Sequence, residues 1–314
     1  MYANRYEKRD FRGNKMLTKL EELIGKGHVL YDEPMKKHTT FRVGGPARAL
    51  VEPGSAEDVK SVVEFCKSEQ IPYYIVGNGS NLLVGDKGFR GAIIQLYKSM
   101  GTFQVEGNQI TAQAGCSLAQ IANAALDAAL TGFEFAAGIP GTLGGAVVMN
   151  AGAYGGEMND VLTSVRVMTE EGEIMELPAE ELGLGYRTSI IPEKRYIVLG
   201  AVISLTEGKK EEIKAQMDDL RQKRVSKQPL EYPSAGSTFK RPEGYFAGKL
   251  IQDSGLKGFT VGGAQVSEKH SGFVINKGNA TAADVMELIR QVTAKVKEDT
   301  GVTMEPEVKQ IGEF

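Results

Sequence analysis

Apolar residues in the first third of the chain follow two different spacings. The segment that starts at Ser55 and Asp58 has a capping-box pattern, followed by apolar residues three or four positions apart. That spacing predicts a helix with one buried face. The apolar face consists of Val59, Val62, Val63 and Cys66. Residues 71–76, in contrast, form a short unbroken apolar run, which predicts a buried strand. A mixed α/β fold is therefore expected.

Strand-like runs and capped helices continue to alternate further along. Ser117 can cap a helix, and Thr281 with Asp284 can cap another that ends at Gly301. The composition changes at residues 207–210, where a charged helix begins, so we place a domain boundary near residue 207. The strand-like runs are residues 92–96, 109–114, 161–169, 174–177, 197–205 and 273–276.

Length and charge then restrict the class of protein. With 314 residues, 41% hydrophobic and 25% charged, the chain has the composition of a globular enzyme of two or three domains. The net charge is -3 and no dense basic run occurs, which argues against nucleic acid as a partner. No apolar run approaches the ~20 residues of a membrane span. Residues 1–15 are charged and predict an extension rather than a signal peptide.

Only two cysteines and three histidines are present. Cys66 and Cys116 give no disulfide framework and no CxxC motif, so a reduced, cytoplasmic protein is expected. The scattered histidines predict no metal site. Cys66 lies on the apolar helix face and is expected in the core. Cys116 precedes the Ser117 cap, where either a buried thiol or a reactive thiolate would fit.

The most unusual segment is residues 138–156. Seven of its nineteen residues are glycine, the others are mostly small or apolar, and none is charged. A flexible linker would contain more Ser, Lys and Glu. Glycine here allows main-chain N–H groups to approach a ligand closely. We expect a turn that holds a ligand, with a purely structural turn as the alternative.

A second glycine-containing turn follows the predicted strand at 71–76. Residues 77–84, Gly-Asn-Gly-Ser-Asn-Leu-Leu-Val, can present several N–H donors to one anion. Leu82 occupies the place of the third glycine of a Rossmann fingerprint, so that motif is absent. A simple tight turn is the alternative.

Three further segments point less clearly to chemistry. Residues 221–224, Arg-Gln-Lys-Arg, fit either a solvated helix end or a clamp for a phosphate. Ser237 lacks the G-x-S-x-G elbow of a hydrolase nucleophile. Gly248-Lys249 is followed by Leu250, so it is no phosphate-binding P-loop.

Seven short motifs, taken in order, resemble the UDP-N-acetylenolpyruvoylglucosamine reductase (MurB) family. The resemblance runs from about residue 37 to 313. Any one motif would be weak, and their common order makes the resemblance specific. The motifs are residues 74–83, 138–145, 150–155, 186–187, 236–239, 247–251 and 307–308.

The resemblance implies an α+β protein. It consists of an FAD-binding fold of the vanillyl-alcohol-oxidase/PCMH type, with two α/β subdomains, and a C-terminal α/β substrate domain. The expected boundaries are 1–36 for an N-terminal extension and helix, and 37–206 for the FAD-binding domain. Its subdomains cover about 37–97 and 98–206. Residues 207–314 form the MurB-type C-terminal domain.

The resemblance also implies the reaction and its cofactors. The expected reaction is NADPH-dependent reduction of UDP-N-acetylenolpyruvoylglucosamine to UDP-N-acetylmuramate, a peptidoglycan precursor. FAD is expected to be non-covalent, because no histidine attachment motif is seen, and the protein is expected to be a monomer. The family's FAD contacts map onto Gly77, Asn78, Gly79, Ser80, Asn81, Leu82, Gly138, Gly141, Thr142, Gly144, Gly145 and Ala146.

The family's three catalytic residues map onto Arg187, Ser237 and Glu307. Hydride addition at the β carbon leaves negative charge on the α carbon and carboxylate of the substrate. Arg187 and Glu307 would polarise that region, with Glu307 protonated or sharing a proton. Ser237 would donate the proton to the α carbon, assisted by Lys249 or Arg224.

Some members of the family carry a long tyrosine-bearing loop, which this chain lacks, since only a short link joins Leu205 to the next predicted helix. The chain thus resembles the shorter subgroup. Tyr154 and Arg221, with Arg224 and Lys249, are the candidates that hold the substrate. Two alternatives are a flavin oxidase or dehydrogenase with another substrate, and a nucleotide-sugar-binding protein without activity.

Overall fold

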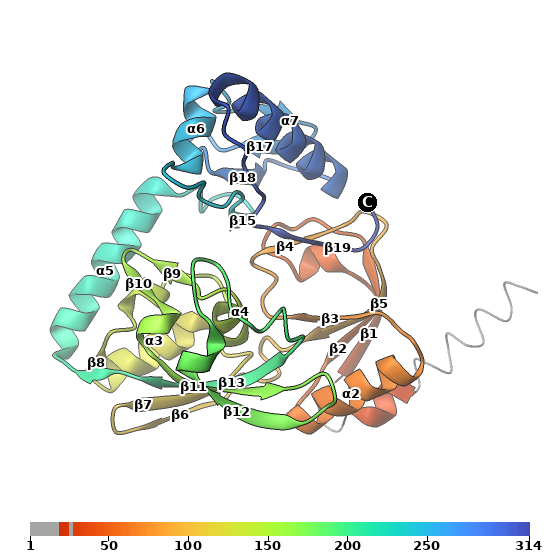
Figure 1. Ribbon diagram of the computed structural model, residues 1–314, viewed down its shortest axis with the longest axis vertical. Helices are drawn as coiled ribbons and strands as arrows, with labels where there is room; N and C mark the ends of the chain where they lie inside the picture. Colours follow the sequence, from red (N-terminus) through yellow and green to blue (C-terminus); the bar gives the residue numbers. More distant parts are fainter. Residues whose placement is uncertain (1–18, 25–27) are drawn as a thin grey trace, which may run out of the picture. The chain divides into compact units, whose positions relative to one another are not determined.

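The computed structural model describes residues 19–24 and 28–314. Contacts divide the chain into two compact units (Figure 1). Unit 1 contains Ala47–Gly77 and Gly91–Ala215 with the described part of residues 1–33, and unit 2 contains Pro34–Pro46, Asn78–Arg90 and Gln216–Phe314. The expected N-terminal extension lies mostly outside the described residues, and the domain boundaries drawn from the sequence stay a prediction.

Unit 1 contains a four-stranded sheet of order β1-β2-β5-β3. Strands β3 and β5 pair in parallel, with Tyr73 opposite Ala92. The helix α2 lies between β2 and β3 in the chain, and the Ser55 hydroxyl accepts a hydrogen bond from the Asp58 N–H at 3.0 Å. The elements are β1 (His28–Pro34), β2 (Pro46–Glu52), α2 (Ala56–Ser68), β3 (Tyr73–Val76) and β5 (Phe89–Gln95).

A second sheet of unit 1 is antiparallel throughout, in the order β12-β11-β13-β7-β6. Helices α3 and α4 pack against strands of this sheet. Both faces of its central strand β13 are mostly buried, which explains its unbroken apolar sequence. The elements are β6 (Phe103–Glu106), β7 (Gln109–Gln113), α3 (Leu118–Asp127), α4 (Leu143–Val148), β11 (Leu162–Met168), β12 (Ile174–Pro178) and β13 (Ile197–Ser204).

Short pieces complete unit 1. Strands β9 and β10 form a hairpin, and β8 pairs antiparallel with the distant β14. The strands are β8 (Leu130–Thr131), β9 (Gly152–Ala153), β10 (Gly156–Glu157) and β14 (Thr206–Glu207). The 3-10 turns of the described chain are η2 (Met35–Lys37, in unit 2), η3 (Glu134–Ala136), η4 (Met158–Asp160) and η5 (Ala179–Leu182).

Unit 2 has a four-stranded antiparallel sheet of order β15-β18-β17-β16, with α7 packed on β16 and β17. A capping box formed by Thr281 and Asp284 starts α7, and Gly301 ends it in the left-handed conformation. The elements are β15 (Ser234–Ser237), α6 (Ala247–Asp253), β16 (Thr260–Val261), β17 (Ala264–Val266), β18 (Phe273–Asn276) and α7 (Ala282–Thr300).

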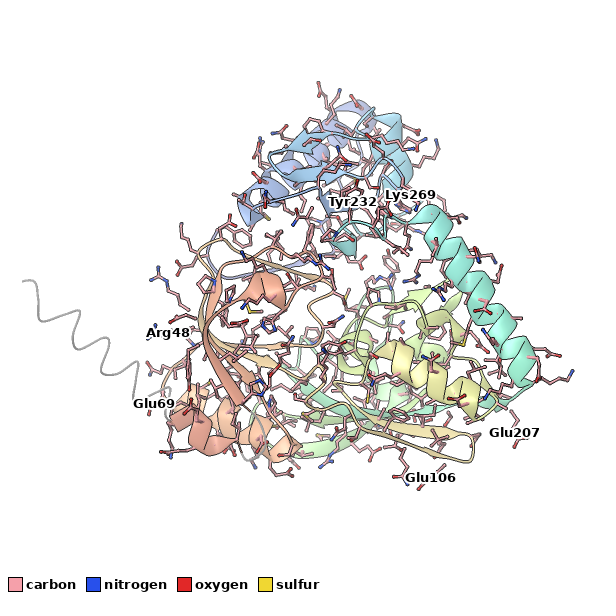
Figure 2. The ribbon with its side chains drawn as sticks, turned by 180° about the vertical axis from the view of Figure 1, so that it is seen from behind. Arg48, Glu69, Glu106, Glu207, Tyr232 and Lys269 are labelled. Atoms are coloured by element: carbon pink, nitrogen blue, oxygen red, sulfur yellow. The ribbon has the colours of Figure 1, made fainter. Side chains whose placement is uncertain are left out.

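The helix α5 (Lys210–Lys227) begins in unit 1 and ends in unit 2. Near its end, the Lys269 ammonium donates to the Val225 carbonyl at 2.8 Å. The Lys277 ammonium donates to the Tyr232 hydroxyl at 2.9 Å, and Figure 2 labels Tyr232 and Lys269. These contacts hold the segment that leads from α5 into the sheet of unit 2.

The segment after Gly77 belongs to unit 2 by its contacts. Its strand β4 (Leu82–Val84) pairs in parallel with β19 (Lys309–Ile311), the last strand of the chain, and the two lie side by side in Figure 1. Leu83 joins the core of unit 2 together with apolar residues of α6, β17, β18 and α7. The whole segment Asn78–Arg90 therefore folds with the C-terminal part of the chain in unit 2.

Most predicted elements are confirmed. The capped helices form at Ser55, Ser117 and Thr281. An observed strand overlaps each of the expected runs at 92–96, 109–114, 161–169, 174–177, 197–205 and 273–276. The capping box at Ser55 is only half formed. The Ser55 hydroxyl accepts from the Asp58 N–H, but the Asp58 carboxylate accepts from the Gly54 N–H rather than from the Ser55 N–H. Among residues 19–24 and 28–314, no helix is long and apolar enough to cross a membrane.

Candidate functional site

The two predicted ligand-holding segments meet inside unit 1. We call residues 77–83 the first glycine turn and residues 138–146 the second glycine turn. A Cβ atom at Gly77 would overlap the Thr142 hydroxyl, so only glycine lets the two turns approach this closely. The Gly77 carbonyl also accepts from the Gln95 side chain at 3.2 Å. The structure therefore brings the two turns together at one point.

Main-chain hydrogen bonds fix the second glycine turn onto the start of α3. The Leu118 N–H donates to the Gly141 carbonyl at 3.1 Å, and the Leu143 N–H donates to the Cys116 carbonyl at 2.9 Å. Thr142 is buried and precedes α4. The turn is thus rigid, with its geometry set by neighbouring strands and helices rather than by a ligand.

The glycines of the second turn serve different purposes. Gly144 is buried, and a Cβ there would come within 2.9 Å of the Ala114 Cβ. Gly138 and Gly145 are exposed. Gly144 therefore serves helix packing, whereas Gly138 and Gly145 leave main chain open to solvent, where a ligand could approach.

The first glycine turn continues into unit 2. Gly79 is buried with φ +62°, and a Cβ there would overlap the His38 carbonyl oxygen. Its own carbonyl accepts from the Thr40 N–H at 3.2 Å. Neither turn carries an acidic side chain, and close main-chain approach without negative charge suits the diphosphate of a dinucleotide such as FAD. The residues present therefore fit this group.

Arg187 lies at the tip of a tight turn in unit 1. The main-chain groups of Gly185 and Thr188 hydrogen-bond to each other at 3.2 Å, leaving Tyr186 and Arg187 as the two tip residues. Arg187 has φ +54°, a conformation that costs free energy for any residue but glycine. Its guanidinium donates to the Gly152 carbonyl at 3.4 Å and lies 5.5 Å from the centre of the Tyr186 ring.

Tyr154 occupies a similar tip on the neighbouring hairpin β9–β10. Tyr154 and Gly155 both have positive φ, as a two-residue hairpin requires, and the Tyr154 side chain is exposed. The Arg187–Gly152 hydrogen bond connects the two tips. Tyr154, Tyr186 and Arg187 are thereby brought together in unit 1.

Asn150 connects the base of the Arg187 turn to the 3-10 turn η4, a role that the sequence does not reveal. Its side chain is buried, donates to the Gly185 carbonyl at 3.2 Å and accepts from the Asn159 N–H at 2.9 Å. In the sequence, Asn150 stands out only as a single amide among glycines and apolar residues. A polar side chain in such a segment is expected to be hydrogen-bonded if it is buried.

Ser237 ends strand β15 in unit 2 and is exposed. The register with β18 shifts between Ser234 and Ser237, and Gly236 within this bulge has φ +76°. A β-bulge re-aims the side chains that follow it. The hydroxyl of Ser237 is accordingly presented to solvent while its neighbours Thr238 and Phe239 are buried.

Glu307 lies beside Ser237 through main-chain pairing. An isolated bridge joins Phe239 to Pro306, and the Glu307 N–H donates to the Thr238 carbonyl at 2.8 Å. On the other side, the Asn81 side chain donates to the Glu307 carbonyl at 3.3 Å. The structure thus brings together Ser237, Glu307 and the first glycine turn within unit 2.

His270 lies next to this cluster. Its Nδ1 accepts from the Gly272 N–H at 3.1 Å, and its ring packs edge-on against Phe273 at 4.9 Å. Burial lowers the pKa of His270, so the ring is neutral near pH 7 with its proton on Nε2. The Gly272 carbonyl in turn accepts from the Thr238 N–H at 2.8 Å.

The candidate cations lie on helices of unit 2. Lys249 is exposed on α6 and forms an ion pair with Asp253 at 2.7 Å. Arg221 is exposed and Arg224 is half-buried on α5. Their proposed contacts with the substrate, or with Ser237, stay predictions.

The two cysteines are ordinary core residues. Burial raises the pKa of the Cys66 thiol to about 12 and that of the Cys116 thiol to about 11. The prediction that Cys66 belongs to the core is confirmed, and Cys116 is a buried thiol rather than a reactive thiolate. In the described part of the chain, no group of three or more His, Cys, Asp or Glu residues could hold a metal ion.

Comparison with known proteins shows to which family the chain belongs. A model described as FAD binding domain matches residues 47–178, which include both glycine turns. A model described as UDP-N-acetylenolpyruvoylglucosamine reductase, C-terminal domain, matches residues 228–311, which include Ser237 and Glu307. A UDP-N-acetylenolpyruvoylglucosamine reductase of Caldanaerobacter subterraneus subsp. tengcongensis is 55% identical over 298 residues, covering 95% of this chain and 98% of the relative. This chain belongs to the MurB reductase family.

Two further relatives agree with membership of the MurB family. A reductase of the same name from Agathobacter rectalis is 57% identical over 91% of this chain and 95% of the relative. The crystal structure of MurB from Thermus caldophilus is similar with a TM-score of 0.77 at 38% identity, covering 91% of this chain and 98% of that one. The expected fold, an FAD-binding domain followed by a MurB C-terminal domain, is confirmed.

Proposed function

We propose that this protein reduces UDP-N-acetylenolpyruvoylglucosamine to UDP-N-acetylmuramate with electrons from NADPH, using non-covalent FAD, in peptidoglycan biosynthesis. The observation that carries the proposal is identity along the chain: 55% over 95% of its length to a reductase of that name. The matched family models contain the glycine turns in one case and Ser237 with Glu307 in the other.

The glycine turns are proposed to hold FAD. Candidate contacts are the main-chain groups of the first glycine turn, and in the second turn the exposed Gly138 and Gly145 with the half-buried Gly141. The chemistry supplied by bound FAD is hydride transfer, from NADPH and then to the β carbon of the enolpyruvyl ether. The protein contributes binding, orientation and a field suited to the charge that develops.

Ser237 is proposed to complete the addition by moving a proton. Its exposed hydroxyl would donate a proton from Oγ to the α carbon, which bears negative charge after hydride addition. A serine hydroxyl is a weak acid, so a nearby cation or hydrogen-bond network would have to assist it. Lys249 and Arg224 are the candidates for that assistance.

Arg187 and Glu307 are proposed to polarise the carboxylate of the substrate. The guanidinium of Arg187 would offset the negative charge that spreads onto the carboxylate oxygens. Glu307 would act in its protonated form, as a hydrogen-bond donor to the same charge. Tyr154 and Arg221 are proposed to contact the remainder of the nucleotide sugar.

We also infer a cytoplasmic monomer that binds no nucleic acid and inserts into no membrane. Both cysteines are free and buried, as in proteins of a reducing compartment, and the sequence has a net charge of -3 and no dense run of Lys and Arg. Size-exclusion chromatography with light scattering measures the oligomeric state directly.

The test of this mechanism separates the two half-reactions in a stopped-flow spectrometer. Ser237→Ala is expected to leave flavin reduction by NADPH unchanged and to slow reoxidation by the substrate by about 10²- to 10⁴-fold, the usual contribution of a general acid. Ser68→Ala, which removes an exposed hydroxyl on α2, is the control and should change neither rate. Equal slowing of both half-reactions by Ser237→Ala would show that Ser237 has a structural role instead.

A further inference from the structure

Both polar groups of the Glu307 main chain are hydrogen-bonded, and each goes to a different segment of the proposed site. The N–H donates to the Thr238 carbonyl at 2.8 Å, next to Ser237. The carbonyl accepts from the Asn81 side chain at 3.3 Å, within the first glycine turn. The peptide groups on either side of Glu307 are therefore held, and with them the direction in which its side chain leaves the backbone.

The contact through Thr238 is a rigid one. Thr238 is fully buried, and its hydroxyl accepts from the Val274 N–H at 3.0 Å. Its N–H donates to the Gly272 carbonyl at 2.8 Å. Thr238 is thus fixed to the edge of β18 on two sides, and it offers Glu307 a carbonyl that side-chain substitution does not remove.

The contact through Asn81 depends on a side chain. The Asn81 carbonyl accepts from the Lys309 N–H at 3.0 Å, and the parallel pairing of β4 with β19 begins at the next residue. These main-chain bonds keep Asn81 next to Glu307 whatever side chain it carries. The Nδ2 atom of Asn81 donates to the Glu307 carbonyl, so truncation of this side chain removes that hydrogen bond and leaves the main-chain ones in place.

We propose that Asn81 is a positioning residue, whose side-chain amide orients Glu307 while the main chain of the same turn faces the cofactor. The inference rests on the role proposed above for Glu307. It assigns the Asn81 side chain to the proton-transfer half of the reaction rather than to FAD binding. Loss of the Nδ2 hydrogen bond removes this side-chain restraint on the Glu307 carbonyl, while the bonds at the N–H groups of Glu307 and Lys309 remain. The Glu307 carboxyl is then expected to sample more directions, some of them unproductive.

The test uses Asn81→Ala in the flavin-loaded enzyme. We expect reoxidation of the reduced flavin by substrate to slow about tenfold or more, since small misplacements of reacting groups cost up to 10²-fold. Flavin reduction by NADPH and the dissociation constant of FAD should stay within about threefold of the unsubstituted protein, a change worth under 1 kcal/mol. Asn81→Ser, which retains a hydroxyl donor, should recover part of the rate.

Two readouts exclude a merely structural effect. In a double-mutant cycle, Asn81→Ala should cost little once Glu307→Gln is present, because the two residues act as one unit. Hydrogen exchange of residues 305–311 should accelerate in Asn81→Ala, in both the apo and the FAD-bound protein. The control is Asn108→Ala, since the Asn108 amide also donates to a main-chain carbonyl, that of Leu205 at 3.2 Å, in unit 1.

Three results would overturn the inference, and they can be told apart because each changes a different measured quantity. Weaker FAD binding or slower reduction by NADPH in Asn81→Ala would assign its side chain to the cofactor. Additive effects of Asn81→Ala and Glu307→Gln would show that Asn81 acts elsewhere. An unchanged reoxidation rate in Glu307→Gln alone would refute the proposed role of Glu307 itself, and the positioning role with it. If Asn81→Ala fails to fold, Asn81→Ser is measured in the same cycle with the same criteria.

Discussion

At the scale of single residues, three of the ten non-glycine residues with positive φ in the described part of the chain belong to the proposed site in unit 1. Asn150, Tyr154 and Arg187 all have positive φ, between 42° and 54°, and hydrogen bonds join their segments. Non-glycine residues adopt this conformation at a cost, and such strain persists only where surrounding contacts enforce it. Hydrogen bonds between these segments therefore help to hold the three residues in this conformation.

His270 provides a prediction on pH. Because burial lowers its pKa below the unfolded value of about 6.5, its contribution to stability is present above that pH and is lost as pH falls through the lower folded-state pKa. The protein should therefore lose melting temperature more steeply between pH 7 and pH 5 than the His270→Gln variant. Parallel curves for the two proteins, measured by differential scanning fluorimetry, would contradict the assignment.

At the scale of elements, the strongest local signals in the sequence predicted the structure well. Helices α2, α3 and α7 begin at the serine or threonine expected, because a hydroxyl cap and an apolar face are both local properties. The short strands β4 and β19 have no such signature. Their pairing joins residues more than two hundred positions apart, and only the folded chain reveals it.

The candidate site was predictable to a similar extent. Glycine turns, Arg187, Ser237 and Glu307 stand out by residue type and by their resemblance to a family. Asn150, Thr238 and the side-chain role of Asn81 do not, because each acts through a carbonyl or N–H of a distant segment. Hydrogen bonds to main-chain atoms place no demand on the sequence of their partners.

Asp86 provides a prediction at this scale, since it caps a helix from the loop after β4. Its carboxylate accepts from the N–H groups of Ala282 and Ala283, at 2.8 and 2.9 Å, at the start of α7. Asp86→Ala should lower the free energy of unfolding by roughly 1–2 kcal/mol, as lost helix caps do. Urea unfolding followed by circular dichroism measures this.

The matched control for Asp86 is Asp127→Ala, which removes an exposed ion pair with Lys210 at 2.9 Å. Exposed pairs contribute about 0–1 kcal/mol, so the control should cost less. Equal losses for the two variants would show that the Asp86 contacts add nothing beyond surface charge.

At the scale of the whole molecule, the relatives match the chain along nearly all of its length, across both compact units. Each unit is built from several separate segments, and the chain passes from unit 1 to unit 2 between Gly77 and Asn78, inside the first glycine turn. The region that matches an FAD-binding domain, residues 47–178, therefore contributes β4 to unit 2. Part of the sequence that matches the FAD-binding model thus folds together with the C-terminal sequence inside unit 2.

The central claim is that this chain binds FAD and uses it to reduce an enolpyruvyl nucleotide sugar. The most direct measurement is anaerobic stopped-flow absorbance of the purified protein. We predict a yellow protein whose flavin is bleached by NADPH and regains its absorbance when UDP-N-acetylenolpyruvoylglucosamine is added. A protein that takes up no FAD, or a reduced flavin that this substrate leaves bleached, would contradict the account.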